Sequence, residues 1–159
     1  MRNSTRFGIT TVVLVIGSLF TAFGVFAQSD MGKVPREWQT VAEKTNYDRT
    51  GTYDQAVAYA KKLDAASPLI KYATYGNSGE GRDLPLLIAA SDGAFSPKLV
   101  REEGKAVVLV QAGIHAGEID GKDAGFALVR DIAITKTRTK VLDHVVILFQ
   151  GIYNVAGHE

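Results

Sequence analysis

A chain of 159 residues with 46% hydrophobic and 22% charged residues has the composition of an ordinary globular protein of one domain. Lysine and arginine total 18 and aspartate and glutamate total 17, and this balance excludes the basic surface typical of a nucleic-acid-binding protein. The chain has no cysteine, which excludes disulfides and thiolate ligands, so any metal has to be held by histidine, aspartate or glutamate.

The N-terminus has the pattern of a secretory signal peptide. Arg2 and Arg6 precede an uncharged, apolar run over residues 7–27. Val25 and Ala27 are small residues at the positions that a signal peptidase reads, and polar residues follow them. We therefore predict cleavage after Ala27 and export to the periplasm or the extracellular space. The alternative is an uncleaved membrane anchor, because the apolar run is long enough to span a bilayer.

A polar leading segment and a helix are predicted next. Residues 28–50 are polar with scattered aromatic side chains, and we expect them to lie over the domain that follows. A helix is predicted over residues 53–66, because apolar side chains recur there at helical spacing. Thr52 and Gln55 have the spacing of a capping box at its start, and a serine–proline pair ends it.

The rest of the chain predicts a sheet with one connecting helix. Two β-prone runs, 69–75 and 84–90, flank a glycine-rich turn and indicate a hairpin. The near-continuous apolar run over 105–112 predicts a strand covered on both faces. A helical pattern over 119–134 and a buried strand over 141–150 follow. Strand, helix, strand is the signature of an α/β fold, and we expect a three-layer αβα arrangement with a mixed, mostly parallel sheet.

A histidine and a glutamate follow the predicted strand in a glycine-rich loop, QAGIHAGEIDGKDAG (residues 111–125). His115 and Glu118 lie three residues apart, and Gly113 and Gly117 allow the backbone to turn sharply. Sites in open α/β sheets form at the carboxyl ends of strands. Imidazole and carboxylate are natural zinc ligands in a chain without cysteine, and a catalytic zinc takes three protein ligands and a water. The alternative is a surface histidine beside a glutamate that favours the positive end of a helix.

Three stretches have the order and spacing of the motifs of one enzyme family. Residues 75–89, YGNSGEGRDLPLLIA, resemble a hairpin with a Ser-x-Glu-Gly-Arg-x-(Leu/Ile) turn. Residues 107–118, VVLVQAGIHAGE, resemble a strand followed by a His-x-x-Glu zinc motif. Residues 145–159, VVILFQGIYNVAGHE, resemble a strand that ends in Asn-x-Asp-Gly. Together these motifs resemble those of the zinc carboxypeptidase family, typified by pancreatic carboxypeptidase A.

The resemblance implies a function and a site. His115 and Glu118 would be the first two ligands of Zn²⁺ in a metallocarboxypeptidase that hydrolyses C-terminal peptide or related amide bonds with a metal-activated water. In the family, the third zinc ligand, the glutamate base and the arginine that binds the substrate carboxylate come well after the Asn-x-Asp-Gly turn. The resemblance thus implies that residues 51–159 are the N-terminal part of the catalytic domain, an incomplete fragment without a catalytic residue of its own and inactive alone.

This interpretation predicts a peptide or amide substrate as the partner. It predicts no nucleic-acid partner. No stable membrane partner is expected unless the segment 1–27 stays uncleaved. Of the other histidines, His144 is expected at the opposite end of its strand from the candidate site. His158 lies on the correct side but is expected to have no metal role, and Arg82 is expected to be an exposed turn residue.

A second hypothesis belongs to another class of protein. The chain would be a non-catalytic binding module that retains the front part of a peptidase fold. Ala156 favours this hypothesis slightly, because it stands where the family typically has aspartate. Such a module would have to fold stably without zinc.

Overall fold

The computed structural model describes residues 34–91 and 93–158. The chain divides into two units, Met1–Val34 and Pro35–Glu159, and the fold below is that of the second unit. The predicted signal peptide lies outside the described residues and stays a prediction. In the described part of the chain, no helix is long and apolar enough to cross a membrane.

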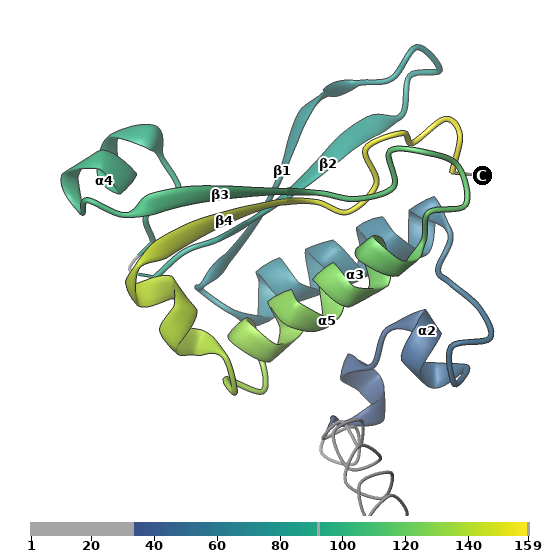
Figure 1. Ribbon diagram of the computed structural model, residues 1–159, viewed down its shortest axis with the longest axis horizontal. Coiled ribbons are helices and arrows are strands. Elements are labelled where there is room, and N and C mark those ends of the chain that lie inside the picture. Colours follow the sequence, from purple (N-terminus) through teal and green to yellow (C-terminus); the bar gives the residue numbers. More distant parts are fainter. Residues whose placement is uncertain (1–33, 92, 159) are drawn as a thin grey trace, which may run out of the picture. The chain divides into compact units, whose positions relative to one another are not determined.

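A mixed four-stranded sheet forms the centre of the second unit (Figure 1), with the strand order β1-β2-β4-β3. The strands are β1 (Ile70–Asn77), β2 (Asp83–Ala89), β3 (Ala106–Gln111) and β4 (Val145–Gln150). The pairs β1–β2 and β2–β4 are antiparallel, and β3–β4 is parallel. The predicted mixed α/β sheet is confirmed. Parallel pairing does not predominate among the described strands, because the β1–β2 hairpin attaches to β4 in antiparallel orientation.

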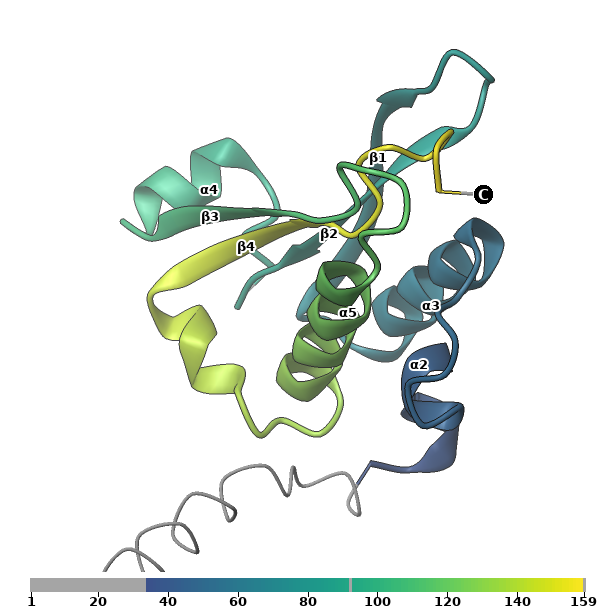
Figure 2. The same cartoon turned by 45° about the vertical axis from the view of Figure 1, so that its right-hand side comes forward.

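Helices cover both faces of this sheet, as expected for three layers (Figures 1 and 2). The helices α3 (Tyr53–Ala66) and α5 (Asp120–Ala133) lie along one face, and the short helix α4 (Pro97–Glu102) lies on the other. The pleat of β4 divides its side chains between the two cores. Ile147 and Phe149 belong to the core beneath α3 and α5, whereas Val146 packs with α4.

The two apolar runs of the parallel pair differ in burial. β4 lies between β2 and β3 and is largely buried. It begins at Val145 and not at residue 141 as predicted, because a 3-10 helix, Thr139–Asp143, occupies the start of the predicted run. β3 is an edge strand of the described sheet, and the side chains of Val107, Val108 and Leu109 are 54%, 42% and 52% exposed. The expectation that this strand is covered on both faces is therefore wrong for the described residues.

Helix α3 has the predicted bounds and the predicted cap. The Thr52 hydroxyl accepts a hydrogen bond from the Gln55 N–H at 3.3 Å, and the Gln55 side chain accepts one from the Thr52 N–H at 3.0 Å. These reciprocal bonds satisfy two backbone donors at the helix start. The helix buries Ala56, Ala60 and Leu63 against the sheet.

Helix α5 approaches β4 closely at Gly125. A Cβ atom at this position would lie 2.2 Å from two ring atoms of Phe149. The same ring packs edge-on against Phe126, with centroids 5.3 Å apart. Gly125 lowers the helix propensity of α5, but its missing side chain lets the helix backbone rest on the Phe149 ring. This contact aligns α5 with the sheet and so positions the loop that enters it.

We predict that Gly125→Ala destabilises the fold although alanine is the better helix former. The added methyl overlaps the Phe149 ring, and overpacking of this kind costs about 1–3 kcal/mol. Urea unfolding monitored by circular dichroism measures the free energy of unfolding. Gly79→Ala is the matched control, because a Cβ at Gly79 meets nothing within 4 Å. Equal or greater stability of Gly125→Ala would contradict the prediction.

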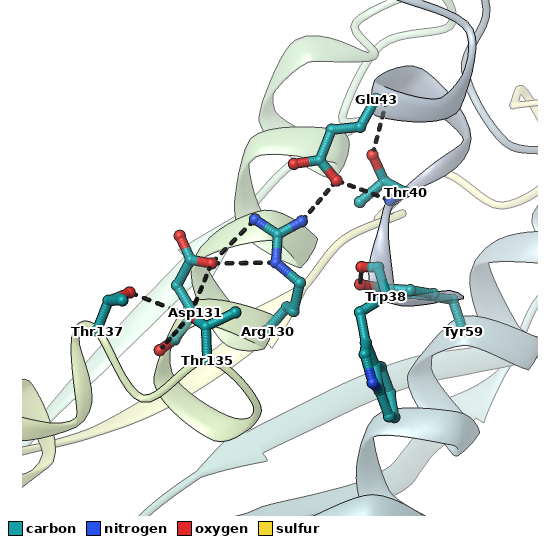
Figure 3. Close-up of polar contacts among 8 residues, drawn as sticks. All are labelled: Trp38, Thr40, Glu43, Tyr59, Arg130, Asp131, Thr135 and Thr137. Atoms are coloured by element: carbon teal, nitrogen blue, oxygen red, sulfur yellow. Dashed lines mark hydrogen bonds and ion pairs between the residues drawn. The ribbon is translucent and has the colours of Figure 1, made fainter. Parts of the chain in front are cut away.

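A buried ion pair attaches the leading segment to α5 (Figure 3). Arg130 Nη1 donates to Glu43 Oε2 at 2.5 Å, and its Nε and Nη2 donate to Asp131 Oδ1 at 3.0 and 2.9 Å. Glu43 lies in α2 (Val41–Lys44) and also accepts the Thr40 N–H at 2.8 Å. The side chains of Arg130 and Glu43 are 3% and 8% exposed and are hydrogen-bonded, which is the condition under which charges are tolerated in a protein interior.

We predict an acid-sensitive contribution of Glu43 to stability. Burial alone raises the pKa of its carboxyl group, but hydrogen bonds from Arg130 and the Thr40 N–H outweigh burial and hold the pKa below 4.5. A depressed folded-state pKa means that the stabilisation is complete above the unfolded value and is lost as pH falls through the folded value. Glu43→Gln should therefore cost about 1–3 kcal/mol at neutral pH. Urea unfolding of both proteins from pH 7 to pH 3 should show this difference shrinking below about pH 4.5; a constant difference would contradict it.

Candidate metal centre

The loop between β3 and α5 places the predicted metal-ligand pair at the carboxyl end of β3. Gly113 and Gly117 have φ angles of +62° and +87°, in the left-handed region that glycine adopts without strain. A Cβ atom at Gly113 would also lie 3.4 Å from the Gly151 carbonyl oxygen. The loop therefore turns sharply out of the sheet while it runs close to the segment that follows β4.

His115 and Glu118 face one another across this loop. His115 Nδ1 lies 2.7 Å from Glu118 Oε1, and the His115 N–H donates to Glu118 Oε2 at 3.2 Å. The Glu118 N–H in turn donates to the His115 carbonyl oxygen at 3.2 Å. Their side chains are 78% and 56% exposed. Backbone hydrogen bonds thus hold an imidazole nitrogen and a carboxylate oxygen at one solvent-accessible point.

The chemistry and placement of this pair fit zinc. Two tetrahedral ligand atoms at zinc–ligand distances of about 2.0–2.2 Å are separated by about 3.4 Å, so a small opening of the pair would admit the ion. A third protein ligand is needed for a catalytic zinc. Within residues 34–91 and 93–158, no group of three or more His, Cys, Asp or Glu side chains is arranged to hold a metal. Among the described residues, His115 and Glu118 are therefore candidate ligands, and no third side chain is arranged with them to complete a metal site.

The contact with His115 also favours the ionised form of Glu118. Hydrogen bonds from the His115 side chain and from its backbone N–H lower the pKa of the Glu118 carboxyl below 4.5. An ionised carboxylate is the form that binds a metal ion. The hydrogen bond from the His115 N–H to Oε2 does not involve the imidazole, so it orients the carboxylate before any metal arrives and reduces the ordering that binding requires.

We predict that His115→Ala raises the pKa of Glu118 part of the way toward 4.5. The variant removes the side-chain hydrogen bond but keeps the backbone N–H of residue 115, so part of the lowering remains. Side-chain carboxyl signals followed by ¹³C NMR through a pH titration measure the change. His144→Ala, at an exposed position before β4, is the control and should leave the Glu118 pKa unchanged. The same change in both variants would contradict the prediction.

The other two histidines lie elsewhere. His144 follows the 3-10 helix before β4 and thus lies at the amino end of that strand. The His158 ring is held against the start of α5, where its Nε2 lies 3.2 Å from Lys122 Nζ and 3.3 Å from the Gly51 carbonyl oxygen. Lys122 is buried and also donates to the Gly51 carbonyl. The ammonium group beside His158 opposes metal binding there, and the contacts give His158 a structural role.

The segment after β4 is hydrogen-bonded directly to the loop between β3 and α5, which carries His115 and Glu118. The Tyr153 N–H donates to the Ala112 carbonyl and the Asn154 N–H donates to the Gly113 carbonyl, both at 2.9 Å. The Asn154 side chain closes its own turn by accepting the Gly157 N–H at 3.0 Å. The Asn-x-x-Gly stretch and the His-x-x-Glu stretch, separate in sequence, therefore form one continuous hydrogen-bonded unit.

The hairpin turn between β1 and β2 reaches the same region. The Ser78 hydroxyl accepts the N–H groups of Glu80 and Arg82 at 3.3 and 3.2 Å, and Gly81 has a φ of +80°. Arg82 Nη1 donates to the Val155 carbonyl oxygen at 3.2 Å. The expectation that Arg82 is simply an exposed turn residue is therefore wrong. No local pattern indicates this contact, because it joins residues 73 positions apart.

Comparison with known proteins identifies the family. The family model for zinc carboxypeptidase matches residues 56–159, and the chain belongs to this family. The match includes both the hairpin turn and the loop with His115 and Glu118. No curated protein sequence matches the chain. Family membership establishes a metallopeptidase-like fold.

Solved structures of carboxypeptidases have the same fold. Carboxypeptidase A from Helicoverpa armigera matches 95% of this chain and 33% of its own length, with a TM-score of 0.60 and 16% identity. Bovine thrombin-activatable fibrinolysis inhibitor, solved with a tick carboxypeptidase inhibitor, matches 71% of this chain and 34% of its own, with a TM-score of 0.56 and 18% identity. A metallo-carboxypeptidase from Burkholderia cenocepacia covers 67% and 28%, with a TM-score of 0.54 and 21% identity. The chain thus spans about a third of the length of these structures.

Proposed function

We propose that this chain is part of an exported, zinc-dependent metallocarboxypeptidase that hydrolyses C-terminal peptide or related amide bonds. Family membership supports the reaction class. The observation that carries the metal assignment is the 2.7 Å convergence of His115 Nδ1 and Glu118 Oε1 at the carboxyl end of β3. The apolar N-terminal run with its small-residue cleavage pattern supports export.

In this proposal His115 and Glu118 hold the zinc ion. When bound, zinc supplies Lewis-acid polarisation of a carbonyl group and activation of a water molecule. If Nδ1 of His115 held the metal, the imidazole would carry its proton on Nε2. The His115 N–H continues to orient Glu118 through its bond to Oε2. The backbone therefore fixes the carboxylate independently of the imidazole proton.

The 159-residue chain alone is proposed to be inactive. The described residues supply two zinc ligands, and we assign neither a general base nor a substrate-binding arginine among them. Removal of transition-state stabilisation by such groups costs several orders of magnitude in rate.

Titration of the purified chain with Co²⁺, a spectroscopic substitute for Zn²⁺, tests the metal assignment. We expect His115→Ala and Glu118→Gln each to lower the affinity at least about tenfold, because each removes one ligand group. His144→Ala is the control and should match the unmodified chain. Equal affinities in all four proteins would contradict the assignment. Zinc-dependent release of a C-terminal residue by the unmodified chain would contradict the proposed inactivity.

Thermal unfolding separates the enzyme fragment from the binding-module hypothesis. A binding module unfolds cooperatively without metal, shows no change with a chelator, and has no affinity for Co²⁺ that depends on His115. A metal-dependent fragment is stabilised by Zn²⁺, and its melting temperature rises with the Zn²⁺ concentration, because the ion binds the folded state preferentially. This stabilisation should disappear in His115→Ala.

A further inference from the structure

Arg82 connects the hairpin turn to the unit that carries the candidate metal ligands. Its backbone is held by two hydrogen bonds to Ser78, from its N–H to the Ser78 hydroxyl and from the Ser78 N–H to its carbonyl at 2.8 Å. Its guanidinium carbon lies 5.8 Å from the centroid of the Tyr53 ring. Tyr53 is itself fixed, because its hydroxyl donates to the Asp83 carbonyl at 2.8 Å. The guanidinium group is thus located by the turn and by an aromatic neighbour.

The guanidinium group of Arg82 donates a hydrogen bond to the segment after β4. Arg82 Nη1 donates to the carbonyl oxygen of Val155, a buried residue, at 3.2 Å. Glu80 is the acidic neighbour of Arg82, at 4.0 Å on the surface, where ion pairs contribute little. A hydrogen bond from a charged donor to a backbone carbonyl is stronger than a neutral one. Arg82 therefore anchors the main chain at residue 155 whatever side chain occupies the neighbouring position 156.

From Val155 the connection to the metal ligands is short and passes only through the backbone. The preceding residue, Asn154, donates its N–H to the Gly113 carbonyl at 2.9 Å. Gly113 lies two residues before His115, at the positive-φ turn that leads out of β3. A displacement of residue 155 consequently shifts the Asn154 N–H, the donor that holds the Gly113 carbonyl at the start of the loop that bears His115 and Glu118.

We propose that Arg82 is a positioning residue for the metal centre, acting through the Val155 carbonyl and the Asn154–Gly113 hydrogen bond on the loop that bears His115 and Glu118. The part of this inference that is tested by Co²⁺ affinity rests on the proposed function. The hydrogen-bonded connection itself does not depend on the metal. Groups outside the direct ligands commonly change metal affinity by 10–100-fold when they orient the ligands.

Arg82→Ala tests the proposal in the 159-residue chain. We expect its affinity for Co²⁺ to fall about tenfold, with far-ultraviolet circular dichroism unchanged. Hydrogen–deuterium exchange should accelerate in peptides that cover residues 112–118 and 153–155 and remain unchanged in α3. A residue that only stabilises the fold would lower the melting temperature but leave both readouts unchanged at low temperature, and that result would overturn the proposal.

Two further variants make the test specific. Glu80→Gln removes the surface ion pair with Arg82 but leaves the bond to Val155, so it should match the unmodified chain in both readouts. Arg82→Lys keeps a charged donor and should recover most of the Co²⁺ affinity. If Arg82→Ala does not fold, Arg82→Met replaces it, because methionine keeps an apolar stem but has no donor. Arg82→Met should then show the lower affinity and the faster exchange relative to Arg82→Lys. An equal loss in Glu80→Gln and Arg82→Ala would overturn the proposal.

Co²⁺ affinity and hydrogen–deuterium exchange together distinguish a failure of the proposed function from a failure of the positioning role of Arg82. If the unmodified chain binds no Co²⁺ but Arg82→Ala accelerates exchange in residues 112–118, the proposed function is wrong and the positioning connection stands. If the unmodified chain binds Co²⁺ and Arg82→Ala changes neither affinity nor exchange, the proposed function stands and the positioning role is overturned.

Discussion

The contact between Gly125 of α5 and the ring of Phe149 in β4 is the constraint on which the site depends. Because glycine has no Cβ atom, the helix backbone rests directly on the aromatic ring, which in turn packs edge-on against Phe126. This contact holds α5 along the sheet with its first turn at the carboxyl end of β3. The loop between them carries both candidate ligands.

Three motifs that are far apart in the chain meet at this end of the sheet. Figure 1 shows the tip of the β1–β2 hairpin, the loop before α5 and the segment after β4 on the same side of the molecule. Backbone hydrogen bonds connect the second and third of these segments, and Arg82 connects the first to the third. The motifs that the chain shares with the zinc carboxypeptidase family are thus parts of one structural unit. Ser78 and Gly81 are not candidate ligands, but they fix the backbone of the hairpin turn and so orient Arg82.

The difference between β3 and β4 shows what an apolar run can and cannot predict. Both runs are rich in β-branched residues and both form strands, because that composition suits a pleated, packed backbone. Which run is covered depends on strand order, and the insertion of β4 between β2 and β3 leaves β3 with one neighbour in the described sheet. Its edge carries Val107 and Leu109 and no charged side chain from Ala106 to Gln111, a composition that does not oppose pairing with a further strand.

The sequence by itself determined the local features of this protein: the α3 helix with its Thr52–Gln55 cap, the hairpin, the strands, and the His115–Glu118 pair in a glycine-rich loop. Each depends on residues within a few positions of one another, so spacing and propensity suffice to predict it. Only the tertiary structure decided which strand lies at the edge, that Arg130 pairs with Glu43 in the interior, and that Arg82 binds the Val155 carbonyl. These contacts join residues 73 and 87 positions apart, and no local pattern encodes them because the partners meet only once the sheet and helices have packed.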